Sequence, residues 1–186
     1  MLILTFEEIT RLREVAASTI ADYPWRQCLL EMAIIGLSRW SIANLEFKSF
    51  RENVPGVING QPVTFSYAVV WKERNNVERC TRLSPAQWQI VQDYLRWRVR
   101  NSFIKSPNVF VCKSRSDGVY SKAMKPERVR SEIRLLGKDA YVADKLEIPA
   151  IHRGMANWLR SKGTSEKIIS EFYGNKIYAD KSEELV

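Results

Sequence analysis

The sequence is poor in the residues that build metal and disulfide sites. It contains one histidine, His152, and three cysteines, Cys28, Cys80 and Cys112, which are far apart and form no CxxC pair. This pattern predicts neither a disulfide framework nor a zinc site. A single histidine also excludes acid–base chemistry that needs two of them. We therefore expect no metal and no cofactor, and interpret the cysteines as small buried side chains in a reducing compartment.

Long apolar runs are missing as well. No run approaches the roughly 18–20 apolar residues that a membrane-spanning helix needs. Residues 1–8 lack the basic start and the apolar core of a signal peptide. Internal repeats and low-complexity linkers are also absent. The sequence thus predicts one cytoplasmic domain over residues 1–186 that has no membrane partner.

Negative charge is scarce relative to positive charge. The chain has 29 Lys and Arg against 21 Asp and Glu, a net charge of +8. Such a surplus favours polyanionic partners, nucleic acid first and an anionic membrane surface second.

The first part of the chain predicts two helices. Thr5 and Glu8 have the spacing of a capping box, and apolar residues then recur at helical spacing, so a helix is expected over residues 6–21. Residues 25–45 are typical of a second, largely buried helix, although Gly36 lies inside it.

The next part predicts strands. Residues 63–71 are rich in strand-forming side chains, Asn75 and Asn76 indicate a turn, and residues 79–83 form a short partner strand. We expect a hairpin, or a three-stranded sheet that includes residues 47–57.

The remainder predicts mainly helices. Ser84 and Gln87 form a capping pair, and Pro85 suits the first helical position. A short apolar segment follows at residues 107–112. Further helices are expected at residues 126–136, 152–162 and 165–173. The predicted fold class is α+β, mostly helical with a small antiparallel sheet.

Several short sequence motifs follow one another along the chain in a recognisable order and spacing. Residues 35–45 read Ile-Gly-Leu-Ser-Arg-Trp-Ser-Ile-Ala-Asn-Leu, and residues 152–163 read His-Arg-Gly-Met-Ala-Asn-Trp-Leu-Arg-Ser-Lys-Gly. Gly174 follows Gly163 by 11 residues. From about Leu4 to Gly174, this order and spacing resemble the catalytic domain of the tyrosine recombinases (phage-integrase family). The resemblance implies the fold of that domain, and we expect the family's separate N-terminal core-binding domain to be absent.

The resemblance also implies a chemistry. A tyrosine attacks a DNA phosphate and leaves a 3′-phosphotyrosine, while two arginines, a lysine and two histidines (or a histidine and a tryptophan) surround it. Ser38 stands at the first arginine position, and Arg39 is one residue late. A one-residue slip that places Arg39 and Ser41 in the motif is an alternative. Lys72, before the predicted turn, matches the general-acid lysine.

The second half of the pattern departs further. Pro149 takes the place of the first histidine, His152 that of the second arginine, and Arg153 is again one residue late.

The end of the chain departs from the pattern as well. Asn175 replaces the second histidine, and Glu184 stands where the tyrosine is expected. The only nearby tyrosines are Tyr173 and Tyr178, and Tyr178 precedes the expected place by 6 residues. Because one such loss already costs orders of magnitude in rate, we expect impaired cleavage.

Two basic groups remain as expected DNA contacts, because Lys and Arg side chains bind phosphates. The first group surrounds one predicted helix that lies along DNA in the family: Lys122, Lys125, Arg128, Arg130 and Arg134. The second group follows in the next helices: Arg153, Arg160, Lys162 and Lys167.

Three hypotheses follow. The first is a DNA-binding protein without efficient catalysis that regulates or assists recombination, associated with the nucleoid and encoded by a prokaryote, virus or mobile element. The second is an active recombinase with a displaced site made by Arg39, Lys72, His152, Arg153 and Tyr178. The third is a protein that binds and modulates a partner integrase. The expected partner is double-stranded DNA, with a partner integrase or further copies of the chain bound on it.

Overall fold

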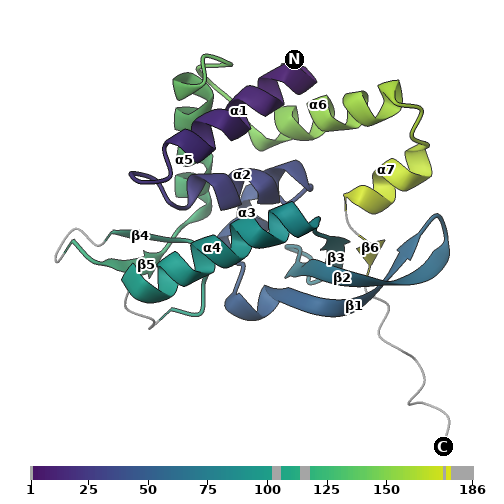
Figure 1. Ribbon diagram of the computed structural model, residues 1–186, viewed down its shortest axis with the longest axis horizontal. Coiled ribbons are helices and arrows are strands. Elements are labelled where there is room, and N and C mark those ends of the chain that lie inside the picture. The colour runs from purple at the N-terminus through teal and green to yellow at the C-terminus, as the bar shows by residue number, and fades with distance from the viewer. Residues whose placement is uncertain (1, 102–105, 114–117, 174, 177–186) are drawn as a thin grey trace, which may run out of the picture.

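The computed structural model describes residues 2–101, 106–113, 118–173 and 175–176. Figure 1 shows α1, α2, α5 and α6 on one side of the molecule and the larger sheet on the other, with α7 between α6 and the sheet. The helices are α1 (Phe6–Ser18), α2 (Arg26–Ile34), α3 (Arg39–Ala43), α4 (Pro85–Asn101), α5 (Pro126–Asp139), α6 (Ile148–Ser161) and α7 (Glu166–Phe172), with a 3-10 turn at Phe47–Ser49. The strands are β1 (Phe50–Ile58), β2 (Gln61–Lys72), β3 (Glu78–Arg82), β4 (Val111–Lys113), β5 (Tyr120–Ala123) and β6 (Asn175–Lys176). The predicted α+β class is confirmed.

The larger sheet is antiparallel, with strand order β1-β2-β3-β6, and β4 pairs with β5 in a second sheet. The predicted three-stranded sheet is therefore confirmed, and the short β6 extends it. Asn59 and Gly60 close the β1–β2 hairpin with φ of 52° and 79°, the left-handed conformations that a two-residue turn requires.

Alternate side chains of β2 point to opposite faces of the sheet. Val69 and Trp71 are buried in the main core beneath the helices. Ala68 and Val70 point the other way and belong to a smaller apolar cluster, which also contains Cys80 of β3. One face of the sheet thus packs against the helices.

The prediction of one helix over residues 25–45 was wrong. Gly36 has φ of +103°, and a Cβ there would lie 2.5 Å from a ring carbon of Tyr173. The backbone therefore breaks after α2, and Ser38 starts α3 as its N-cap. The other helix ends differ less: α1 stops at Ser18 rather than residue 21.

Helix α6 begins four residues before the predicted start at residue 152. Pro149 lies in its first turn, where the missing N–H of proline costs nothing. None of the helices in the described part of the chain combines the length and the apolar character that crossing a bilayer would need.

Buried charges join α2 to α5. The Arg26 side chain is 2% exposed, and its guanidinium lies 2.8 Å from Asp139 Oδ2 and 3.5 Å from Glu132 Oε2. Glu132, 1% exposed, also pairs with Arg128 at 2.6 Å. The ring of Tyr23 covers the Arg26 guanidinium at 3.6 Å. Removing one partner from such a pair leaves an uncompensated buried charge, which is strongly destabilising.

We therefore expect Glu132→Ala to lower the free energy of unfolding by roughly 3 kcal/mol, the cost of breaking a buried ion pair from one side. Urea denaturation measures the change. Glu127→Ala is the control, because Glu127 is exposed in the first turn of the same helix. Equal losses in the two variants would contradict a structural role for the buried pair.

Candidate functional site

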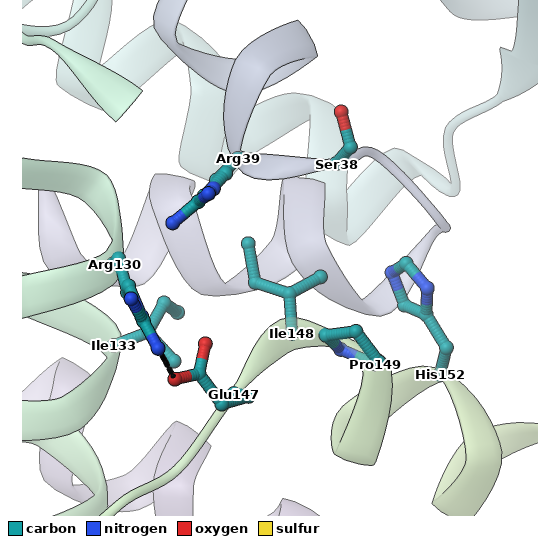
Figure 2. A pocket seen from close by; sticks show the side chains of 8 residues that line it. All are labelled: Ser38, Arg39, Arg130, Ile133, Glu147, Ile148, Pro149 and His152. Atoms are coloured by element: carbon teal, nitrogen blue, oxygen red, sulfur yellow. Dashed lines mark hydrogen bonds and ion pairs between the residues drawn. The ribbon is translucent and has the colours of Figure 1, made fainter. Parts of the chain in front are cut away.

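A cavity of about 460 Å³, which we call the helical cavity, opens where α3, α5 and the start of α6 meet. Figure 2 shows Arg39 and Arg130 on one side of it and Pro149 and His152 on the other. Its full lining is Ser38, Arg39, Arg130, Ile133, Glu147, Ile148, Pro149 and His152.

A second hollow of about 370 Å³, the hairpin hollow, adjoins the first because Ser38 lines both. Its other lining residues come from the α2–α3 break and from the β2–β3 turn: Gly36, Ser41, Trp71, Glu73, Arg74 and Asn75. The structure thus brings three of the positions matched to the catalytic pattern, Ser38, Pro149 and His152, around one cavity.

The hydroxyl of Ser38 is used to cap α3. Ser38 Oγ accepts a hydrogen bond from Ser41 N at 3.1 Å and lies 2.9 Å from Ser41 Oγ. In Figure 2 this hydroxyl points away from Glu147. Arg39, the first residue of α3, lines the cavity, and no residue in the described ranges forms an ion pair or hydrogen bond with its side chain.

Glu147 brings a negative charge into the helical cavity, and two arginines of α5 hold it. Arg130 lies 2.6 Å from Glu147 Oε1 through Nη2 and 2.8 Å through Nε, and Arg134 contacts the same oxygen. Burial would raise the pKa of Glu147, but the hydrogen bonds from Arg130 and Arg134 outweigh it and the pKa falls below its ordinary value. The carboxylate is therefore ionised at neutral pH.

His152 is held as a neutral ring. Burial lowers its pKa from the ordinary value, and the nearby charge of Arg153 adds to this, while the backbone of Ala33 and Leu37 acts in the opposite direction. Within the described ranges, no group makes a hydrogen bond with its buried Nε2. The Tyr173 hydroxyl donates to the His152 carbonyl at 2.7 Å, and burial raises the pKa of Tyr173 to about 12.

The β2–β3 turn contributes a cation that the sequence analysis did not single out. Lys72 is exposed at the end of β2, opposite Glu78 in the ladder, and does not line the hairpin hollow. Arg74, two residues later, does line it, and no described residue pairs with its side chain. The turn itself, and not the end of β2, therefore supplies the cation that lines the hollow.

Another of the proposed catalytic residues, Arg153, does not line the cavity. Arg153 Nη2 donates to the carbonyl of Leu2 at 2.9 Å, so its guanidinium joins α6 to the N-terminal segment. Tyr178, like Glu184, lies outside the described residues. Asn175 lies on β6, opposite Cys80 of β3.

The expected DNA contacts fall into two classes. Arg128, Arg130, Arg134 and Arg160 pair with carboxylates, the last with Glu166. The lysines are exposed, and none of their side chains forms an ion pair or hydrogen bond with another described residue: Lys122, Lys125, Lys162 and Lys167. In the part of the chain that the structure describes, no cluster of His, Cys, Asp and Glu side chains could hold a metal ion.

No protein-family model and no curated protein matches the sequence. Solved structures do match. The crystal structure of XerA recombinase superposes with a TM-score of 0.70 at 16% identity, over 94% of this chain and 56% of that one. The chain has the fold of a tyrosine-recombinase catalytic domain. The fold implied by the resemblance is thereby confirmed.

Two structures of the XerH site-specific recombinase bound to difH substrates also match this fold. The post-cleavage complex gives a TM-score of 0.65 and the pre-cleavage complex 0.61, each at 14% identity over 92% of this chain. The chain spans about half the length of these recombinases, 56% of XerA and 46% of XerH.

Sequence reasoning missed two charged residues of the site, Arg74 and Glu147. Arg74 stands next to a predicted turn, so the turn itself was a usable signal. Glu147 offered none, because its partners lie 13 and 17 residues earlier on another helix.

The lowered pKa of His152 generates a prediction about pH. As the neutral ring is favoured in the folded state, stability is full above the ordinary pKa of about 6.5 and declines as pH falls below it. We expect the free energy of unfolding to fall less on acidification in His152→Gln than in the parent chain. Since His152 is the only histidine, its ring resonances give the titration directly by NMR. A titration midpoint of the His152 ring at or above the ordinary histidine pKa of about 6.5 would contradict the prediction.

Proposed function

We propose that the chain binds double-stranded DNA across the helical cavity and the hairpin hollow, and that it does not cleave DNA strands efficiently. A phosphate that approaches the two hollows meets Arg39 on one side of Ser38 and Arg74 on the other. Exposed Lys122 and Lys125, before and at the start of α5, extend the contact along the backbone.

One observation carries the binding proposal: Arg39 and Arg74 line adjoining hollows, and neither is paired with a described residue. A cation without a partner is available to a phosphate at no cost of breaking an existing pair. The fold adds support, since XerH has this fold and was solved in complex with a DNA substrate. The net charge of +8 favours the same partner.

The residues around the helical cavity support the proposal that the chain does not cleave DNA strands efficiently. Strand transfer needs cations on the reacting phosphate and a proton for the leaving oxygen. Ser38 is neutral and caps α3, Pro149 has no side-chain donor, and His152 is neutral. Glu147 adds a negative charge to the same cavity. DNA binding can persist when these catalytic positions are replaced. Efficient catalysis of strand cleavage cannot, because its rate depends on several groups that act together.

Binding is tested with Arg39→Ala on mixed-sequence duplex DNA, followed by fluorescence anisotropy at several salt concentrations. Loss of one phosphate contact should weaken binding about tenfold and flatten the salt dependence by roughly one in slope. The matched control is Arg11→Ala, because Arg11 is exposed on α1 and its removal changes the net charge equally. If the two variants lose the same DNA affinity, the proposal that the two hollows form part of the DNA interface is contradicted.

Cleavage is tested by trapping. We expect no detergent-stable adduct between the chain and a pool of nicked duplexes of randomised sequence, because the uncharged residues Ser38, Pro149 and His152 stand at the positions matched to the two catalytic arginines and a catalytic histidine. Denaturing electrophoresis of labelled DNA detects such an adduct. An adduct that disappears in Tyr178→Phe would overturn this half of the proposal and establish a displaced active site.

A further inference from the structure

We propose that Arg130 and Arg134 form a phosphodiester-binding site on α5 that Glu147 occupies in the DNA-free chain, and that bound DNA displaces this carboxylate. The inference rests on the proposed DNA-binding function. It assigns Glu147 the role of an internal competitor for DNA.

The geometry of the contact resembles anion recognition. Both guanidiniums converge on a single oxygen, Glu147 Oε1: Nε and Nη2 of Arg130 lie at 2.8 and 2.6 Å, Nε of Arg134 lies at 3.1 Å, and Nη2 of Arg134 contacts it too. Arg130 and Arg134 are one turn apart on α5 and therefore neighbours on its surface. Two guanidinium forks around one anionic oxygen suit a phosphate oxygen equally well.

Glu147 has no capping role that would explain its place. It is the N-cap residue of α6, yet its side chain makes no capping hydrogen bond. Residues at this position usually cap with a short side chain, whereas Glu147 reaches across to α5. The Glu147 carboxylate therefore binds Arg130 and Arg134 instead of capping α6.

The contact is accessible enough to be exchanged. The side chains of Arg130, Arg134 and Glu147 are 42%, 37% and 35% exposed. Ion pairs with this exposure contribute little net stability, so a DNA phosphodiester, which carries the same single negative charge, can replace the carboxylate. Arg39, which shares the helical cavity with Arg130, is already unpaired among the described residues and would meet the incoming phosphate first.

A second pair in the chain provides a matched comparison. Arg160 binds Glu166 through both of its oxygens, at 2.5 and 3.0 Å, and neither residue lines the helical cavity or the hairpin hollow. Glu147→Gln and Glu166→Gln each raise the net charge by one. Any difference between them in DNA affinity therefore reports the position of the carboxylate, not the total charge.

The experiment measures duplex binding by the parent chain and both variants by fluorescence anisotropy over a range of salt. We expect Glu147→Gln to bind about fivefold more tightly than Glu166→Gln, with a salt slope steeper by roughly one to two because released arginines reach phosphates. Arg130→Gln should cost more affinity in the Glu147→Gln background than in the parent chain, as expected for coupled residues.

Equal affinity of Glu147→Gln and Glu166→Gln, with the parent chain still binding DNA, overturns the displacement and leaves the proposed function intact. Failure of all three proteins to bind any duplex at low salt overturns both. If Glu147→Gln does not fold, Glu147→Asp replaces it, since it keeps the charge but shortens the reach by one methylene. A gain in affinity supports the proposal, and an unchanged affinity overturns it.

Discussion

Helix α2 is surrounded on nearly all sides, and it nevertheless carries two charged residues that must be paired inside the protein. All its residues except Gln27 are buried. Arg26 is matched by acids of α5, and Glu31 accepts hydrogen bonds from Arg13 of α1 and Gln87 of α4. Because an unpaired buried charge costs several kcal/mol, these bonds fix how three helices pack around α2. The remaining elements are arranged around this packing.

The end of α2 then determines the shape of the candidate site. Gly36 turns the chain in a left-handed conformation that leaves room for Tyr173, and Ser38 starts α3 directly afterwards. The turn places Arg39 at the helical cavity and leaves Ser38 between the two hollows. A site built this way has cations suited to holding a phosphate, but it has few groups that could move a proton.

Much of the fold could be predicted because its signals are local. Ser84 and Gln87 cap α4 as their spacing indicates, and the strands follow the runs of β-formers. The sequence shows Gly36 inside the predicted helix, but it does not show that the helix breaks there. The residue that leaves no room for a side chain at this position is Tyr173, 137 positions later. The same limit applies to the site. Glu147 forms its ion pairs only because the fold places Arg130 and Arg134 of α5 next to it, and no local sequence pattern predicts that contact.

The last turn of α7 is a junction of three elements. The Glu171 carboxylate accepts hydrogen bonds from the amides of Asn59 and Gly60 in the β1–β2 turn, the Phe172 carbonyl accepts one from Thr81 of β3, and the Tyr173 hydroxyl donates to α6. A displacement of α7 must therefore break its contacts with the hairpin tip, the sheet and α6 in a single event. We therefore expect the hairpin tip and α7 to open as one unit of local unfolding, although more than a hundred residues separate them in the chain.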